Sequence, residues 1–146
     1  ICSNKTHIIH NAESCESNQT YKGILNNYAK ANYYSNTFVS ENAQKTEGYQ
    51  LSKGILLTDN CSFFSKPELR IFADDVKCSH GCTVGQLDKE ALFYLKTRGI
   101  PEKEAKALLT YAFANNVLES VNIPNLKTRI NSLIANKLGV NLGFDL

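Results

Sequence analysis

Short runs of β-branched and aromatic residues fill the first 85 positions, separated by Asn, Ser and Gly, which favour turns. Within residues 68–73, Leu69, Ile71 and Ala73 fall on one face and the intervening residues on the other, as a strand buried on one side requires. The pattern predicts strands around residues 7–9, 21–25, 32–34, 37–39, 55–57, 69–72 and 76–78. Because the runs are unevenly spaced, they do not distinguish a sandwich, a barrel and a solenoid of stacked parallel strands.

After Gly85 the apolar residues recur at helical spacing. Asp88 is a good N-cap for a first helix, and Gly99 stands where that helix would end. Pro101 opens a second helix and Pro124 a third, because the missing N–H of proline costs nothing in a first helical turn. The predicted apolar stripes are Ala91, Leu92 and Leu95; Ala105, Leu108, Leu109, Ala112 and Phe113; and Leu126, Ile130, Leu133, Ile134 and Leu138.

These two patterns predict a mixed β and α protein with two parts, a β core over residues 1–85 and a C-terminal helical domain of about three helices over residues 86–146. A length of 146 residues fits one domain or two small halves. No apolar run approaches the roughly 18 residues that span a bilayer, so we expect no membrane association. The chain begins at Ile1 and contains no methionine, which leads us to expect a processed or excised start.

Charge and cysteine usage narrow the function classes. The net charge of +2 is too small to drive nucleic-acid binding by counterion release. The five cysteines are odd in number and scattered, so they do not indicate a disulfide framework, and a reducing compartment is expected.

The chemically richest segment is residues 74–82. On a strand, Cys78, His80 and Cys82 alternate onto one face, and thiols with an imidazole suit zinc, copper(I) or iron-sulfur species. The structural alternative is a buried cysteine beside a solvated histidine, which is commoner than a ligand set. Asp74 and Asp75 are adjacent and point to opposite faces of a strand, so a turn is the stronger interpretation than an acid-base pair.

The sequence contains none of the G-x-S-x-G, H-E-x-x-H or Walker patterns of common enzymes. The residues therefore give no positive evidence for a classical enzyme. A carbohydrate-active enzyme on a solenoid would need a pair of catalytic carboxylates, which the sequence does not present.

Several segments carry a family resemblance, and they follow one another in order over at least residues 15–120. They are Ala-Gln-Lys-Thr at 43–46, the run at 49–59, the run at 66–81, Thr-Val-Gly-Gln-Leu-Asp at 83–88, residues 91–95, residues 98–100 and Tyr-Ala-Phe-Ala-Asn at 111–115. Together they resemble the SufB/SufD family of SUF-system iron-sulfur cluster assembly proteins. The Cys-Ser-His-Gly form at residues 78–81 is similar to the SufD branch.

This resemblance implies the last coils of a right-handed parallel β-helix followed by a helical domain. It implies a scaffold subunit that has no turnover of its own, pairs with SufB through the last coils and docks SufC, an ABC-type ATPase. His80 matches the family histidine at the SufB interface, where it would act as a ligand or proton-transfer group for a transient iron-sulfur cluster. Cys78 matches the pattern as a second ligand, and Tyr94 and Arg98 match positions expected to contact SufC.

Cys82 departs from the family pattern, so the resemblance assigns it no role. The alternative function is a stand-alone metal or iron-sulfur carrier that uses Cys78, His80 and Cys82. Against the family, the chain reads as the C-terminal part of a longer SufD-like protein, in the plastid stroma or the bacterial cytoplasm. Because a β-helix cut open exposes unpaired strand edges, we expect self-association or a segment that covers the edge.

Overall fold

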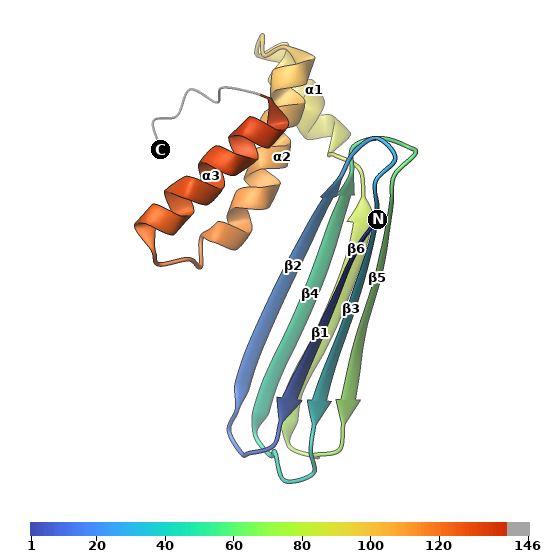
Figure 1. Ribbon diagram of the computed structural model, residues 1–146, viewed down its shortest axis with the longest axis vertical. Coiled ribbons are helices and arrows are strands. Elements are labelled where there is room, and N and C mark those ends of the chain that lie inside the picture. The colour runs from blue at the N-terminus through green and yellow to red at the C-terminus, as the bar shows by residue number, and fades with distance from the viewer. Residues whose placement is uncertain (140–146) are drawn as a thin grey trace. The chain divides into compact units, whose positions relative to one another are not determined.

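A computed structural model describes residues 1–139 and divides the chain into two compact units, Ile1–Gly85 and Gln86–Leu146. The first unit holds all the strands described and the second holds the helices (Figure 1). The chain is therefore a mixed β and α protein, as predicted. The end of the predicted helical domain, after Gly139, lies outside the described residues.

Within the described residues, six strands form two sheets of three, and the strands are parallel to one another within each sheet (Figure 1). One sheet has the order β1-β3-β5 and the other β2-β4-β6, so the chain alternates between the sheets and each pair of successive strands makes one turn. The strands are β1 (Cys2–His10), β2 (Glu16–Leu25), β3 (Lys30–Val39), β4 (Thr46–Leu56), β5 (Ser62–Ile71) and β6 (Val76–Gly85).

Register follows from the length of each turn. Cys2 pairs with Ala31 and Lys30 with Ser62, and in the second sheet Glu16 pairs with Glu47 and Thr46 with Val76. Partners are thus about 30 positions apart throughout, and each inward side chain stacks on its equivalents in the neighbouring turns, roughly 4.8 Å away. The middle turn, β3 and β4, is the most buried because it has a neighbour on each side.

The space between the two sheets has apolar clusters toward both ends of the strands. One cluster is formed by Leu25, Tyr33, Cys61 and Phe63, and Tyr21 stacks on Tyr33 with ring centroids 3.9 Å apart. The other cluster contains Val39, Ala43 and Ala73, with Val76 and Cys78 packed against it.

Between these clusters the interior is polar. Gln19 Oε1 accepts a hydrogen bond from the Ser35 hydroxyl at 2.7 Å, and the Ser65 hydroxyl donates to Ser52 at 2.8 Å. Buried Thr37 accepts a hydrogen bond from Gln50. This polar middle explains why the predicted strands are too short: residues 32–34 and 37–39 belong to one strand, and the hydrophobic pattern does not register buried Ser, Thr and Gln.

Gly54 on β4 creates the room for one of the large core side chains. A Cβ at Gly54 would overlap Cδ1 of Phe63 and lie 3.0 Å from Cε1 of the same ring. At Gly23, which is the register partner of Gly54 on β2, a Cβ would lie 3.4 Å from the ring, an ordinary contact. Phe63 is 8% exposed and belongs to an apolar cluster, so its ring has little room to move.

In the helical unit, the predicted boundaries of α1 (Lys89–Thr97), α2 (Glu102–Leu118) and α3 (Pro124–Leu138) are confirmed within a few residues. Asp88 Oδ1 accepts hydrogen bonds from the N–H groups of Glu90 at 2.8 Å and Ala91 at 3.2 Å, as expected for an N-cap. Gly139 closes α3 at φ 64°, the left-handed conformation that glycine adopts without strain. No helix in the described part of the chain is long and apolar enough to cross a membrane.

The predicted apolar stripes of α2 and α3 are partly wrong. In α2 the buried side chains are Ala105, Ala107, Thr110, Tyr111 and Leu118, whereas Ala112 is exposed. In α3 Asn131 is buried, whereas Leu133 is 60% exposed and Leu126 is 42% exposed. Within the helical unit, α2 contacts both α1 and α3. The face that each helix buries therefore depends on how these helices pack against one another as well as on the apolar stripe of each helix.

The first prediction concerns Gly54. We expect Gly54→Ala to lower the free energy of unfolding by about 1 to 3 kcal/mol, because the added methyl group overpacks the core against Phe63. Gly23→Ala, the matched control, should cost much less and so separates overpacking from the general effect of removing a strand glycine. Urea denaturation of both variants measures this, and equal stabilities would contradict the described packing.

The second prediction concerns Glu102, which joins α1 to α2. Its carboxylate lies 2.9 Å from Lys96 Nζ and 2.7 Å from Lys106 Nζ. Hydrogen bonds from Lys106 and Lys96 lower the pKa of Glu102 from 4.5 to about 2. Because the pKa is lowered in the folded state, the stabilisation is complete above about pH 4.5 and is lost as the pH falls toward 2.

We therefore expect Glu102→Gln to lower the melting temperature of the helices slightly at pH 7, since exposed ion pairs contribute little, and to have a much smaller effect near pH 2. Circular dichroism melts across this pH range measure the difference, with Glu104→Gln in the same helical turn as the control. A Glu102→Gln effect that is as large at pH 2 as at pH 7 would show that the ion pairs are not its cause.

Candidate functional site

The last strand, β6, places the predicted site residues on its inward side. Cys78, His80 and Cys82 pair in register with Gly48, Gln50 and Ser52 of β4, all of which are buried in the space between the sheets. Within the described residues no further strand pairs with the other edge of β6. His80 and Cys82 are therefore exposed although they face inward, and Cys78 is half-buried.

The three side chains do not converge on one point. Residues two apart on a strand are separated by roughly 6.6 Å, so Cys78 and Cys82 are about 13 Å apart along β6. Among residues 1–139, no group of three or more His, Cys, Asp or Glu side chains is arranged to hold a metal ion. The arrangement is a line of separate donors that would need groups from elsewhere to complete a metal or cluster site.

Cys78 contributes to the core. It packs against the cluster of Val39, Ala43 and Ala73, and its Sγ would be 3.2 Å from a Cβ built on Gly48. The glycine thus leaves room for the sulfur atom. Cys78 fills space in the apolar end of the interior. The imidazole of His80, in contrast, makes no side-chain hydrogen bond with any described residue.

Directly beside His80 lies Gln50, which sequence reasoning did not identify. Gln50 is 5% exposed, and its Nε2 donates to the Thr37 hydroxyl and to the Glu68 carbonyl at 3.4 Å. Its Oε1 has no hydrogen-bond partner among the described residues. Only the register of β4 and β6 reveals this neighbour, because the two residues are 30 positions apart in the chain.

Asp74 and Asp75 lie in the exposed turn between β5 and β6, as predicted. The Asp75 backbone N–H donates to Gln44 Oε1 at 2.9 Å, and the Asp75 carbonyl accepts from the Lys45 N–H at 2.6 Å. The two aspartates therefore end one strand and begin the next, and nothing in this turn pairs their carboxylates for catalysis.

Tyr94 and Arg98 lie together in the helical unit. The Arg98 guanidinium carbon is 5.1 Å from the centre of the Tyr94 ring, a cation–π geometry. Tyr94 is 55% exposed, and the neighbouring Phe93 is 69% exposed. An exposed aromatic and cationic group of this kind is suited to contact with another protein.

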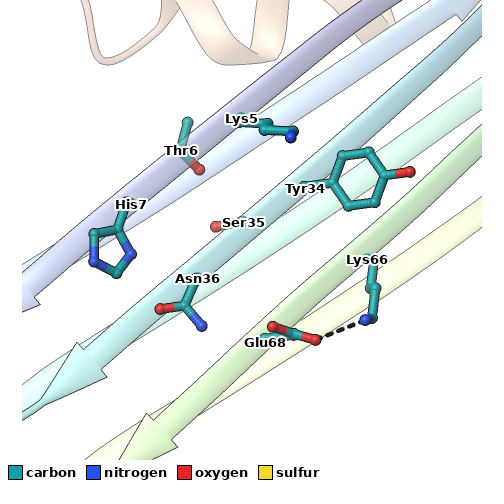
Figure 2. A pocket seen from close by; sticks show the side chains of 8 residues that line it. All are labelled: Lys5, Thr6, His7, Tyr34, Ser35, Asn36, Lys66 and Glu68. Carbon is teal, nitrogen blue, oxygen red and sulfur yellow. Dashed lines mark ion pairs between the residues drawn. The ribbon is translucent and has the colours of Figure 1, made fainter.

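The outward faces of both sheets carry polar groups that the sequence pattern did not reveal. On the β1-β3-β5 sheet, Lys66 Nζ lies 2.8 Å from Glu68 Oε1 and Lys5 Nζ lies 5.7 Å from the centre of the Tyr34 ring (Figure 2). These groups surround a shallow pocket of about 260 Å³, lined by Lys5, Thr6, His7, Tyr34, Ser35, Asn36, Lys66 and Glu68.

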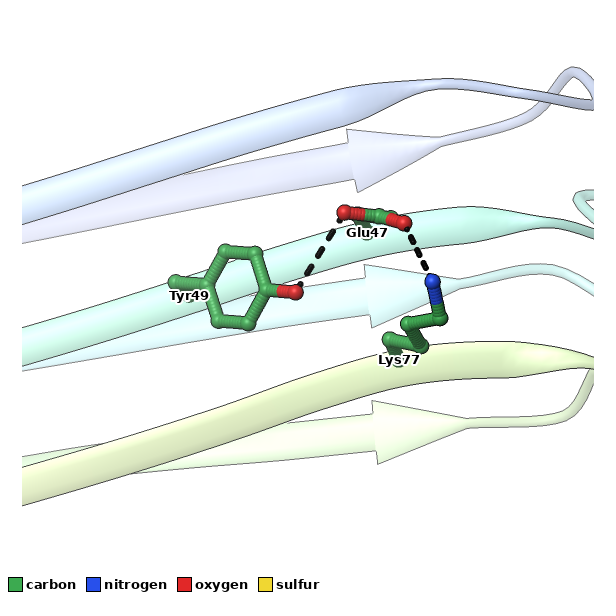
Figure 3. A network of polar contacts seen from close by, with 3 residues as sticks. All are labelled: Glu47, Tyr49 and Lys77. Carbon is green, nitrogen blue, oxygen red and sulfur yellow. Dashed lines mark hydrogen bonds and ion pairs between the residues drawn. The ribbon is translucent and has the colours of Figure 1, made fainter.

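On the β2-β4-β6 sheet, Lys77 Nζ lies 2.9 Å from Glu47 Oε1, and the Tyr49 hydroxyl donates to Glu47 Oε2 at 3.3 Å (Figure 3). The hydrogen bond from Lys77 is the main cause that lowers the pKa of Glu47, and the same bond raises the pKa of Lys77. Lys77 thus remains paired on the outer face, while its neighbours Cys78 and Val76 face inward.

Comparison with known proteins identifies a matching family and several relatives. Residues 1–113 match a family model described as "SUF system FeS cluster assembly, SufBD core domain". The iron-sulfur cluster assembly protein SufD of Escherichia coli is 36% identical over 138 residues, which is 94% of this chain and 33% of that protein.

Two further relatives come from photosynthetic organisms. An iron-sulfur cluster assembly SufBD family protein of Synechocystis is 37% identical over 118 residues, covering 81% of this chain and 26% of the relative. The chloroplastic protein ABCI7 of Arabidopsis thaliana is 37% identical over 114 residues, covering 77% of this chain and 24% of the relative. The chain thus spans about a quarter to a third of the length of these curated relatives.

The third prediction separates the two inward cysteines of β6. We expect Cys78→Ser to lower the free energy of unfolding by about 1 kcal/mol, because a hydroxyl group would replace a sulfur atom against apolar neighbours. Cys82→Ser, at an exposed position of the same strand, should change it by less than about 0.5 kcal/mol. Urea denaturation under reducing conditions compares them, and equal effects would contradict a packing role for Cys78.

Proposed function

The chain belongs to the SufBD family of SUF-system iron-sulfur cluster assembly proteins, and from this premise we propose that it is a SufD-like scaffold subunit without turnover of its own. It pairs with SufB and docks the ATPase SufC. Similarity to SufD of E. coli over 94% of the chain supports this assignment. Because the chain spans about a third of that protein, the partners and the activity of the whole protein are part of the proposal.

The proposal includes the architecture of the first unit. Two parallel three-stranded sheets with register steps of about 30 residues are compatible with coils of a right-handed parallel β-helix. In such a solenoid the last coil has an unpaired edge, and unpaired edges of parallel strands accept a further strand from another chain. We propose that β5 and β6 are the SufB-facing coil, and that without SufB the same edges favour self-association.

The observation that carries the site assignment is the position of His80. It faces inward in register with buried Gln50, on a strand whose other edge is unpaired within the described residues, and it makes no side-chain hydrogen bond there. A partner on that edge would enclose the imidazole. We propose that His80 then serves a nascent iron-sulfur cluster, the cargo of the complex, as a ligand or proton-transfer group.

The other residues take lesser parts in the proposal. Cys78 is a second ligand near the same edge, although its packing makes it chiefly a core residue. Tyr94 and Arg98 contribute to SufC docking, supported by their exposed cation–π pair. A bacterial cytoplasm and a plastid stroma both agree with this function, because the relatives include bacterial SufD and a chloroplastic protein.

A stand-alone carrier built on Cys78, His80 and Cys82 is less well supported, because the three donors are spread along one strand. Anaerobic reconstitution of the isolated chain, followed by iron, sulfide and zinc analysis, tests it directly. Stoichiometric tight metal without partners would favour the carrier over the scaffold.

The fourth prediction tests the proposed scaffold. With SufB and SufC co-expressed, we expect the tagged chain to capture both partners, and His80→Ala to leave capture intact while lowering cluster assembly at least about tenfold. Ser79→Ala is the matched control, because it changes an exposed neighbour on the opposite face of β6.

Cluster assembly is measured from the visible absorption and the iron and sulfide content of the purified complex. Normal assembly by His80→Ala would refute the role of His80 and leave the scaffold proposal standing. Failure of the unmutated chain to capture either SufB or SufC would refute the scaffold itself.

A further inference from the structure

One row of inward side chains crosses the second sheet at the level of the proposed site. Gln19 of β2 pairs with Gln50 of β4, and Gln50 pairs with His80 of β6. Parallel strands place such partners about 4.8 Å apart with their side chains pointing the same way. Gln50 is therefore the immediate neighbour of His80 inside the unit.

The amide of Gln50 is held in one orientation. Its Nε2 donates to the hydroxyl of Thr37 on β3 and to the carbonyl of Glu68 on β5, so both N–H groups point to the opposite sheet. This leaves Oε1 as the free end of the amide. It is buried and has no donor among residues 1–139, and a buried acceptor without a donor is costly enough that one is expected nearby.

Of the two neighbours in the row, His80 is the better donor for Gln50 Oε1. The amide of Gln19 is already anchored, because its Oε1 accepts hydrogen bonds from the hydroxyl groups of two β3 residues, Ser35 at 2.7 Å and Tyr33 at 3.2 Å. The ring of His80 is exposed and unbonded within the described residues, so it can turn toward Gln50 at little cost. A neutral imidazole carries one N–H donor and one acceptor nitrogen.

We infer that His80 donates one ring N–H to Gln50 Oε1, which makes Gln50 a positioning residue for the proposed site. The inference rests on the proposed function only for its consequence, because the hydrogen bond itself is a property of this chain. With one ring nitrogen bonded to Gln50, the tautomer is set and the other nitrogen keeps its lone pair for a cluster atom or a proton. Histidines that act as ligands or bases are commonly oriented by such a bond.

The three histidines of the chain provide internal references for a test. His7 is exposed on the outward side of β1 and its ring makes no side-chain hydrogen bond among the described residues, whereas His10 is buried and its Nε2 lies 2.8 Å from the Ser17 hydroxyl. We expect ¹⁵N-histidine NMR of the unmutated chain, at about pH 8.5 where unperturbed imidazole is neutral, to show one dominant tautomer for His80. Its ring N–H should exchange with water about tenfold more slowly than that of His7. A His80 N–H that exchanges as fast as that of His7 would overturn the inference without any variant.

Three variants sharpen the result. Gln50→Met keeps the length of the side chain but removes the acceptor. The ring N–H of His80 should then lose its protection against exchange with water, and the ring should become a mixture of tautomers. Gln50→Glu keeps an acceptor and should preserve both the slow N–H exchange and the single dominant tautomer of His80. Gln19→Met, the matched control in the same row, should leave His80 unchanged, and loss of protection in this control or its persistence in Gln50→Met would overturn the inference.

This experiment uses neither partner protein nor iron, so its outcome is independent of the proposed function. A protected His80 N–H that depends on Gln50 supports the inference even where His80→Ala assembles clusters normally. An unprotected His80 N–H refutes the inference even where His80→Ala abolishes assembly.

Discussion

In-register stacking of parallel strands is the constraint on which the β unit depends. Each turn of chain returns to the sheets after about 30 residues, so that Gly23 lies beside Gly54 and Gln50 beside His80. Stacking governs the burial of the inward positions, since within the described residues only the middle turn has neighbours on both sides. It also determines that the inward residues of β6 are covered from one side only within the described chain.

A polar middle region follows from this geometry. Buried polar side chains of one sheet form hydrogen bonds with groups of the opposite sheet. Gln50 bonds to groups on β3 and β5, and Ser52 bonds to a group on β5. The apolar clusters at the two ends then supply most of the hydrophobic stabilisation. A region of this kind stabilises the fold only where its groups are satisfied, which is why the unbonded Oε1 of Gln50 beside the unbonded His80 stands out.

The sequence predicted some elements well and others poorly, for identifiable reasons. Asp88, Gly99 and Pro124 mark helix ends because their effects are local, and each one lies at or next to the end of a helix in the structure. Strand lengths were underestimated because buried Ser35, Thr37 and Gln50 do not look like core residues in a hydrophobic pattern. The stripe predicted for α3 was also partly wrong, since Asn131 is buried and Leu133 is exposed on a helix that packs on α2.

By itself the sequence determined the change from strands to helices, the alternation that puts Cys78, His80 and Cys82 on one side of a strand, and a family resemblance that the comparisons confirm. These features depend on residues that are close in the chain or on motifs read in order. Only the tertiary structure decided that Cys78 packs in the core, that His80 lies at an unpaired edge of the described strands, and that Gln50 is its neighbour. The physical reason is that each of these depends on register between strands about 30 residues apart, which is set by the combined packing of all the turns and not by any local pattern.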